Sequence, residues 1–429
     1  MHKIKKLIPQ SVKNVYHLSI AVLANLIFGF PTKKIKVIGI TGTDGKTTTV
    51  QMVTKTLEEA GKKVAMASTI NFQIGNEKWT NLSHYTTESS FAVQKFAAKA
   101  VKNGCDYLIL ETSSHALDQH RVWGINYDIA VITNVTREHL DYHKTIENYR
   151  KAKKKLFEMV SKNKGTIIVN LEMENPNEFL YFEGVNKYGY STKISNNKLQ
   201  ASDLEIVSAQ GMELGIDNSR FVTKNTQFEL NLPGLFNVEN ALAAICVGIT
   251  ENIDLEIINN ALRKLKGVPG RMEHIANEKG LDIIVDFALT PESLEKFYSF
   301  IFTVKKSGAK IISVFGSCGD RDKGKRPIMG KVVSEYADYI ILTNDEPYFE
   351  NPDKIIQEIE VGIKNKKENE TYWKMPDRRE AIKKALKLSK RGDIIAITGM
   401  GAEESMVVAG KKIPWNDRKV VEEELKNLS

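Results

Sequence analysis

Cysteine is scarce in this chain. The 429 residues include only Cys105, Cys246 and Cys318. Their spacing matches neither a disulfide framework nor a metal-binding motif, which argues against a cysteine-stapled secreted domain and against a structural zinc site. A protein of this kind belongs in a reducing compartment, so we expect a cytoplasmic location.

Long apolar runs are also lacking. The most apolar stretch, residues 18–30 (LSIAVLANLIFGF), is shorter than the roughly 20 residues that cross a bilayer. No A-x-A-like cleavage site of a signal peptide follows it. With the basic start MHKIKK, it makes residues 1–34 an apolar and basic segment. We expect a helix docked on the protein, and peripheral membrane contact through residues 18–30 is the alternative.

Neither sign of charge dominates the chain. It has 61 basic and 53 acidic residues, a net charge of +8, and no Lys/Arg block interleaved with aromatic residues. This pattern argues against nucleic acid as a partner and suits small acidic substrates. With 42% apolar and 27% charged residues, the composition is that of a globular protein of two or three domains. We expect a monomer.

Beyond residue 34, apolar runs alternate with helical patterns. Such alternation predicts parallel sheets covered by helices on both faces. The expected strands are residues 35–40, 107–111, 128–134 and 166–170 in a first series, and 283–287, 310–315, 339–344 and 394–398 in a second. Residues 195–232 are polar and turn-rich and predict a small antiparallel excursion.

The segment 267–271 (GVPGR) separates the two series. Its proline and two glycines are typical of a hinge. We therefore place a domain boundary near residue 268. The expected organisation is an N-terminal helical segment over 1–34, a central domain over 35–267 and a C-terminal domain over 268–429.

The stretch Gly39–Thr49 (GITGTDGKTTT) follows an expected strand and precedes a helical pattern, which is the context of a phosphate-binding loop. Gly42 and Gly45 leave the backbone free to curl around phosphate. Lys46 supplies an ammonium for phosphate oxygens, and Thr47 supplies a hydroxyl for Mg²⁺. A glycine-rich turn without a ligand is the plain alternative, which the intact GKTTT sequence disfavours.

Two further stretches follow expected strands, where α/β folds place their ligands. ETSSHAL begins with Glu111, and NVTREHLDYH (134–143) contains Glu138, His139, Asp141 and His143. A single histidine or carboxylate is often structural, but this density of groups suits Mg²⁺ or substrate. The next helical stretch, YRKAKKKLF (149–157), is basic, and its lysines are most simply a solvated face.

Three loops follow strands of the second series. They are VDFALTP (285–291), SCGDRDKGKRP (317–327) and NDEPYFENP (344–352). The second carries basic groups in a glycine-rich turn, and the third carries acids. Together they outline a binding surface that faces the first domain and suits an anionic or zwitterionic substrate.

Nine motifs in the same order along residues 35–425 resemble those of the Mur ligase family. They are GTDGKTTT, ETSSHAL, TNVTREHLDYH, YRKAKKKLF, LPGLFNVENALAA, GVPGRME, VDFALTPESL, GSCGDRDKGKRP and DEPYFENP. The closest resemblance is to the UDP-N-acetylmuramoyl-tripeptide synthetase (MurE-like) branch. It implies an α/β protein, in which a P-loop central ATPase domain with a mainly parallel sheet precedes a C-terminal Rossmann-like α/β domain.

The resemblance implies an ATP-dependent amide ligase of peptidoglycan synthesis, with Mg²⁺ as cofactor and a muramyl peptide and an amino acid as partners. The acceptor carboxylate attacks the γ-phosphate to give an acyl phosphate, and the amine then displaces phosphate. Both steps build negative charge, which Mg²⁺, Lys46 and a helix N-terminus can stabilise. Closure of the two domains would exclude water.

The resemblance also implies roles residue by residue. The expected catalytic residues are Lys46, Glu111, His139 and Lys153. The expected Mg²⁺ ligands are Thr47, Glu111, His139 and Lys153, the last as a carbamate. ATP would be bound by Gly42, Thr43, Asp44, Gly45, Lys46, Thr47, Thr48, Asn237, Asn240, Arg271 and Asp286. The acceptor would contact Thr86, Thr87, Ser113 and Arg121, and the amino acid would contact Arg326, Asp345, Glu346, Tyr348, Gly399 and Glu403.

The chain departs from the family pattern in several places. Residues 1–34 stand where the family has a uridine-nucleotide domain, which we expect to be absent. The TTESS stretch has Glu88 in place of a proline, and DFALTP has Leu289 in place of a histidine. The GKGHE motif becomes GMGAE (399–403), and the Asp-Asn-Pro-Arg motif associated with diaminopimelate becomes Asp-Glu-Pro-Tyr (345–348).

The last change bears on the amino acid. Tyr348 has no positive charge for a second carboxylate, and the neighbouring acids favour an amine, so we expect L-lysine or another diamino acid. Three alternatives stay open. The chain can be a superfamily enzyme for a lipid-linked or other non-UDP carboxylate acceptor, a P-loop switch that needs only the nucleotide half, or an inactive scaffold.

Overall fold

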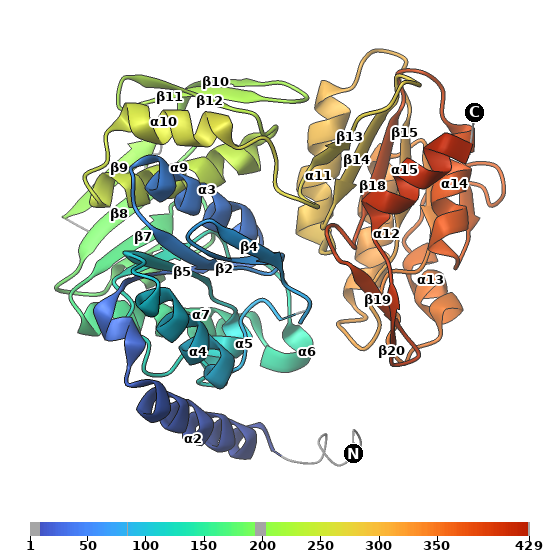
Figure 1. The fold of residues 1–429 in the computed structure, drawn as a ribbon. Coiled ribbons are helices and arrows are strands. Elements are labelled where there is room, and N and C mark those ends of the chain that lie inside the picture. Colours follow the sequence, from blue (N-terminus) through green and yellow to red (C-terminus); the bar gives the residue numbers. More distant parts are fainter. Residues whose placement is uncertain (1–8, 84, 194–202, 428–429) are drawn as a thin grey trace.

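Figure 1 shows the computed structural model of the chain, which describes residues 9–83, 85–193 and 203–427. Two α/β bodies, the central domain and the C-terminal domain, lie side by side and are joined by the segment 265–272. The basic start MHKIKK and residues 195–202 of the expected excursion lie outside the described residues.

A nine-stranded sheet forms the central domain, in the order β4-β3-β2-β5-β1-β6-β7-β8-β9. Its strands are β1 Lys36–Thr41, β2 Val64–Ala67, β3 Asn71–Ile74, β4 Glu77–Thr80, β5 Tyr107–Glu111, β6 Ile129–Ile132, β7 Thr166–Asn170, β8 Asn186–Ser191 and β9 Leu204–Ser208. In this spatial order, all neighbouring strands from β2 through β5, β1, β6, β7 and β8 to β9 pair in parallel. The strands β3 and β4 add an antiparallel edge beside β2. The predicted mainly parallel sheet is confirmed.

Helices cover both faces of this sheet because its central strands are apolar on both sides. In β1, Ile38 and Ile40 enter one core with the helices α3 and α9, whereas Val37 enters the opposite core with α4 and α7. The helices are α3 Lys46–Glu59, α4 Ser90–Lys102, α5 Ser114–Asp118, α6 Leu140–His143, α7 Ile146–Lys162, α8 Asn177–Leu180, α9 Leu235–Thr250 and α10 Leu255–Lys264.

The expected antiparallel excursion is only partly correct. The strands β10 Gln210–Leu214, β11 Ser219–Thr223 and β12 Thr226–Leu230 do form a three-stranded antiparallel sheet. However, β9 pairs in parallel with β8 and extends the main sheet, and Val207 is buried in its core. The five residues of β9 (LEIVS) have a strand-like sequence, but a local sequence does not specify which strand it pairs with.

The C-terminal domain contains a six-stranded sheet in the order β13-β14-β18-β15-β16-β17. Its strands are β13 Glu273–Ile275, β14 Asp282–Asp286, β15 Ile311–Phe315, β16 Tyr339–Leu342, β17 Tyr372–Lys374 and β18 Ile394–Thr398. The helices α11 Pro291–Val304, α12 Lys325–Tyr336, α13 Pro352–Glu360, α14 Arg378–Leu388 and α15 Asp417–Asn427 surround it, with a hairpin of β19 Ser405–Val408 and β20 Lys411–Pro414. Only β13 pairs in an antiparallel manner within the sheet.

The N-terminal helix α2, Gln10–Phe28, packs against α4 and is followed by the short helix η1, Pro31–Lys34. The buried Asn25 fixes this position because its Nδ2 donates a hydrogen bond to the Trp123 carbonyl oxygen at 2.8 Å. The helix ends at Gly29 in the left-handed region. Across the described parts of the chain, no helix combines the length and apolar character needed to cross a bilayer.

Candidate active site between the two domains

The P-loop joins β1 to α3 at the carboxyl edge of the central sheet. Gly45 caps α3 with a φ of +81°, in the region that favours glycine, and a Cβ there would lie 2.4 Å from Asn240 Oδ1. The loop thus brings the N-terminus of α3 to face the gap between the domains. Lys46 Nζ donates to the Thr43 carbonyl oxygen at 2.7 Å, and burial lowers the pKa of Lys46.

A cavity of about 290 Å³ lies where the P-loop meets loops of the C-terminal domain. It brings together many of the residues that the sequence singles out, namely Thr43, Asp44, Gly45, Lys46, Thr47, Thr48, Thr86, Glu111, His139, Asn237, Asn240, Arg271, Asp286, Glu346, Tyr348 and Glu403. The other expected site residues do not line it, namely Gly42, Thr87, Ser113, Arg121, Lys153, Arg326, Asp345 and Gly399.

Thr47 and Glu111 form a pair of oxygen donors beside the P-loop. Thr47 Oγ1 donates to Glu111 Oε1 at 3.0 Å, and the Thr69 backbone N–H donates to Glu111 Oε2 at 2.7 Å. Mg²⁺ prefers oxygen ligands and is usually bound by one or two carboxylates together with substrate phosphates. The described residues hold no group of three or more His, Cys, Asp or Glu side chains suited to a metal. The oxygens of Thr47 and Glu111 are of the type that Mg²⁺ uses together with nucleotide phosphates.

His139 projects from the same edge of the sheet. It adopts a left-handed backbone conformation with a φ of +57° at the start of α6, and its ring packs edge-on against His115 at 4.7 Å between centroids. Burial, aided by neighbouring cationic groups, holds the pKa of His139 well below its ordinary value. Its Nδ1 is buried and has no hydrogen-bond partner within the described structure. Glu138 Oε1 lies 4.0 Å from this nitrogen, beyond hydrogen-bond distance, and a neutral ring without a hydrogen bond there suits a metal ligand.

Lys153 lies on the inner face of α7. Its side chain is 1% exposed, its Nζ donates to the Gly42 carbonyl oxygen at 2.6 Å, and it lies 4.3 Å from the centre of the Tyr149 ring. Burial, followed by the charge of Lys46, holds the pKa of Lys153 well below its ordinary value. The solvated face expected for the lysines of this helix therefore does not include Lys153. A neutral amine is also the form that reacts with CO₂ to give a carbamate.

The expected nucleotide contacts come from both domains. Asn237 and Asn240 are buried on α9, and Asn240 Nδ2 donates to Asn237 Oδ1 at 3.4 Å. Across the cavity, the guanidinium of Arg271 lies 4.3 Å from the centre of the Phe287 ring. Asp286 accepts hydrogen bonds from two backbone N–H groups at 2.7 Å, and burial raises the pKa of its carboxyl.

Among the expected acceptor residues, Thr86 alone faces the cavity. Thr87 Oγ1 donates to the Glu111 carbonyl oxygen at 2.8 Å and accepts from the Ser113 backbone N–H at 2.9 Å. Arg121 donates to the carbonyl oxygen of Thr87. Thr87, Ser113 and Arg121 thus hold the loop that presents Thr86.

Arg326, expected to bind the amino acid, lies elsewhere. Its side chain is fully buried, and its Nη1 donates to Glu350 at 3.0 Å and also to Glu358. Arg321, five residues earlier in the same loop, lines the cavity beside Tyr348, with 5.7 Å between the guanidinium and the ring centre. Of these two arginines, Arg321 is therefore the one that faces the cavity. The basic loop after β15 was a sequence signal, but it did not distinguish the two.

Asp345 and Gly399 lie behind the cavity wall. Burial raises the pKa of the Asp345 carboxyl to about 7, and Cys318 Sγ is 4.0 Å from its Oδ2. A Cβ on Gly399 would meet the same oxygen at 2.5 Å, so glycine is required for this close approach. Glu346 and Tyr348 do reach the cavity, and Tyr348 Oη donates to Glu346 at 2.9 Å.

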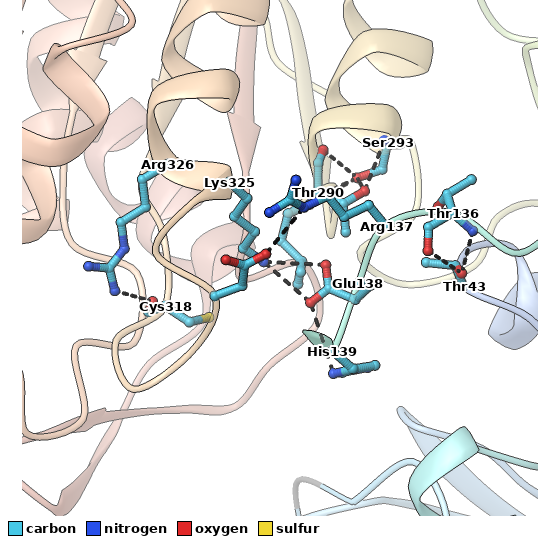
Figure 2. A network of polar contacts seen from close by, with 12 residues as sticks. Thr43, Thr136, Arg137, Glu138, His139, Thr290, Ser293, Cys318, Lys325 and Arg326 are labelled. Atoms are coloured by element: carbon cyan, nitrogen blue, oxygen red, sulfur yellow. Dashed lines mark hydrogen bonds and ion pairs between the residues drawn. The ribbon is translucent and has the colours of Figure 1, made fainter. Parts of the chain in front are cut away.

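A pair of buried side chains connects the domains at this cavity. Figure 2 shows Lys325, at the start of α12, pointing toward Glu138 beside His139. Lys325 Nζ lies 3.4 Å from both Glu138 carboxylate oxygens. At the rim, Arg137 and Asp322 form a second ion pair at 3.5 Å. No local sequence feature indicates a role for Lys325, because its partner Glu138 lies 187 residues away in the chain.

Comparison with known proteins matches both halves of the chain. The Mur ligase middle domain matches residues 40–248, and the Mur ligase glutamate ligase domain matches residues 270–401. A UDP-N-acetylmuramoyl-L-alanyl-D-glutamate–2,6-diaminopimelate ligase of Syntrophomonas wolfei is 38% identical over 413 residues, which cover 95% of this chain and 82% of that protein. A UDP-N-acetylmuramyl-tripeptide synthetase of Roseiflexus is 34% identical, with coverage of 93% and 80%.

A solved structure of a UDP-N-acetylmuramoyl-L-alanyl-D-glutamate–2,6-diaminopimelate ligase has the same fold. It superposes with a TM-score of 0.61 at 29% identity, over 92% of this chain and 79% of that chain. The strand order of the central sheet, the P-loop and the two matched domains all indicate the same family. The chain therefore belongs to the Mur ligase family of ATP-dependent, ADP-forming peptide ligases.

Proposed function

We propose that the protein joins an amino acid to the peptide carboxylate of a muramyl-peptide acceptor. One observation carries the proposal: a single cavity faces the P-loop residue Lys46 and Glu111 on one side and Arg321 and Glu346 on the other. Phosphate chemistry and amino-acid recognition therefore meet in one place. The names of the relatives, which include muramyl-dipeptide ligases, support this acceptor.

In this reaction the acceptor carboxylate attacks the γ-phosphate of ATP, and ADP leaves. The amine then attacks the acyl phosphate carbon, and phosphate leaves. Lys46 and the N-terminus of α3 would position the phosphates and stabilise their negative charge. Mg²⁺ held by Thr47 and Glu111 would supply further positive charge there. The interdomain contacts around Lys325 would limit access of water to the acyl phosphate.

The test is ADP release from ATP, UDP-N-acetylmuramoyl-dipeptide and a panel of amino acids. We expect ADP only when both an acceptor and an amino acid are present. ADP release in the absence of both the acceptor and the amino acid would instead identify a P-loop switch. Loss of ADP release in Lys46→Ala supports the assigned nucleotide site, and retained turnover would rule it out.

We propose that Lys153 carries a carbamate that helps to hold a second Mg²⁺ with Glu111 and His139. The buried amine beside Lys46 supports this, because its lowered pKa favours the neutral form that reacts with CO₂, and the carbamate supplies an anion where a metal needs one. Carbon-13 NMR after equilibration with labelled bicarbonate should show a carbamate signal. The signal should be lost in Lys153→Ala and kept in Lys151→Ala, an exposed lysine on the same helix.

We propose a diamino acid as the incoming substrate. Arg321 lines the cavity and can bind the α-carboxylate, whereas Arg326 is engaged by Glu350 and Glu358 and Arg271 is assigned to the nucleotide. The acids Glu346 and Glu403, which line the same cavity, favour a side chain that ends in an amine. The diaminopimelate ligases among the relatives also use a diamino acid, as their names state.

We propose that the enzyme is a monomer. We also propose that it works in the cytoplasm, because it needs ATP, and that its helix α2 contacts a membrane surface. On this helix Val15, Leu23, Leu26 and Ile27 are 65%, 51%, 64% and 57% exposed, and its sequence contains no acidic residue. An apolar stripe of this kind suits a bilayer interface. Co-sedimentation with anionic vesicles should fall in Leu23→Asp but not in Val361→Asp, whose side chain is 72% exposed and lies in the other domain.

A further inference from the structure

Asp118, at the end of α5, is hydrogen-bonded to three other helices. Tyr142 Oη of α6 donates to Asp118 Oδ2 at 2.9 Å, and Lys155 Nζ of α7 donates to Asp118 Oδ1 at 2.9 Å. Asn14 Nδ2 of α2 donates to the Asp118 carbonyl oxygen at 3.1 Å. Figure 1 shows α5, α6 and α7 close together beside the central sheet. One residue therefore connects helices that are separate in the chain.

The carboxylate of Asp118 is charged and fully engaged. Burial alone would raise the pKa of this carboxyl, but the hydrogen bonds from Lys155 and Tyr142 outweigh burial and lower it. The group is thus an anion at neutral pH, and each of its oxygens accepts a hydrogen bond. Asp118 does not line the active-site cavity. Its contacts therefore serve the neighbouring helices rather than a bound substrate.

The helix α6 is a single turn that needs an attachment outside itself. A helix this short closes few internal hydrogen bonds. His139 before it and Lys144 after it both have positive φ values, +57° and +71°, which side chains seldom adopt. The Tyr142 backbone N–H donates to the His139 carbonyl oxygen at 3.1 Å. The bond from Tyr142 to Asp118 thus fixes the turn from which His139 projects.

The helix α7 is held by the same carboxylate. Lys155 follows Lys153 by two residues, and residues at this spacing lie on nearly opposite sides of a helix. Lys153 reaches the Gly42 carbonyl oxygen of the P-loop, whereas Lys155 reaches Asp118. The two contacts together restrict rotation of α7 about its axis. Asp118 therefore sets the position of Lys153 relative to His139.

We propose that Asp118 is a positioning residue for the second metal site, because it holds α6 and α7 in the arrangement in which His139 and the Lys153 carbamate can share one Mg²⁺ ion. The inference rests on the proposed function, since it deepens the metal site of the same reaction. Residues that orient metal ligands typically contribute about 10–100-fold to metal affinity. Asp118 acts through Tyr142 and Lys155 and adds no covalent step.

Manganese binding to the full-length protein tests this role without turnover. The EPR signal of free Mn²⁺ is measured in the presence of a non-hydrolysable ATP analogue and bicarbonate. The wild-type protein should bind two ions per chain. Asp118→Ala, and Tyr142→Phe, which keeps the ring and removes one donor, should bind the first ion normally and the second about tenfold more weakly. Normal binding of the first ion shows that a variant is folded.

The matched control is Asp128→Ala. Asp128 is a partly buried carboxylate of the same domain that accepts a hydrogen bond from the Val37 backbone N–H at 2.7 Å, and it does not line the cavity. Its replacement also removes a charge and a hydrogen-bond acceptor, so a general loss of stability should appear in both alanine variants. Urea midpoints compare the two stabilities. Only the Asp118 variant should lose affinity for the second ion.

The outcomes separate this inference from the ligase function. A second ion that is weakened in Asp118→Ala and Tyr142→Phe, but not in Asp128→Ala, supports the positioning role. Wild-type affinity in the first two variants, or an equal loss in Asp128→Ala, overturns it. If Asp118→Ala does not fold, Tyr142→Phe decides alone. A single ion in the wild-type protein overturns both this role and the proposed second Mg²⁺ site. If only the ligase function fails, no acceptor gives ADP release while the pattern of ion binding stays as expected.

Discussion

Replacement of Lys325 by methionine tests how the two domains are held together. The ammonium of Lys325 lies 3.4 Å from both oxygens of Glu138, and the two side chains are only 3% and 10% exposed. Methionine keeps the apolar stem but leaves the Glu138 carboxylate buried without its cation. Removing one partner of a buried pair costs about 3–5 kcal/mol when the other stays buried.

Opening of the domains can relieve that cost, because Glu138 then regains water. We therefore expect Lys325→Met to favour an open arrangement rather than to unfold the protein. The 3.4 Å separation is long for a charged hydrogen bond, so we take about 2 kcal/mol for the loss of closure. At 1.4 kcal/mol per factor of ten, kcat/KM should fall by about 30-fold.

Steady-state kinetics and small-angle X-ray scattering measure this effect. Lys325→Met should lower kcat/KM and raise the radius of gyration, and Glu138→Gln in the same chain should restore part of both. Lys323→Met is the matched control, since Lys323 belongs to the same loop but is 54% exposed, and its effect should stay within about 0.5 kcal/mol. Equal losses in the two lysine variants, or no loss in Lys325→Met, would refute the reasoning.

Three more predictions follow from the site. Arg321→Ala should raise the KM for the amino acid at least about tenfold with little change in stability. Arg326→Ala should instead lower the urea midpoint, because it removes the partner of Glu350 and Glu358. The reverse pattern would identify Arg326 as the arginine that binds the substrate. L-Lysine should be used in preference to meso-diaminopimelate when both compete, since Tyr348 cannot pair with a second carboxylate, and preference for meso-diaminopimelate would contradict this charge argument. Burial lowers the pKa of His143 to about 4, so the native ring stays neutral while the unfolded chain gains a proton below about pH 6.5. Stability should therefore be level above pH 6.5 and fall by up to about 1.4 kcal/mol per pH unit from pH 6.5 to 4. Urea unfolding at pH 5 and pH 7 should show a smaller pH effect in His143→Asn, and an equal effect would exclude His143 as the cause.

From the sequence alone, eight strands of the two main sheets and the position of the P-loop could be predicted, whereas β2, β3, β4, β8, β13 and β17 were missed. Alternating apolar runs and helical spacing are local properties, so residues 107–111, 166–170 and 394–398 match β5, β7 and β18. The loop after β1 could be recognised for the same reason, since its glycines, lysine and threonines are contiguous. The prediction that β9 belongs to an antiparallel excursion was wrong, because its place in the main sheet depends on its partner strand β8.

Which side chains share a site depends on packing between segments that are distant in the chain. The chain contains several arginines and lysines in one loop, and packing alone turns Arg326 into the core, Arg321 into the cavity and Lys325 toward Glu138. Lys153 likewise lies on a basic helix whose spacing gave no reason to bury it. The physical cause is the same in each case: burial and charge pairing join residues far apart in the chain, and local sequence patterns do not contain those distances.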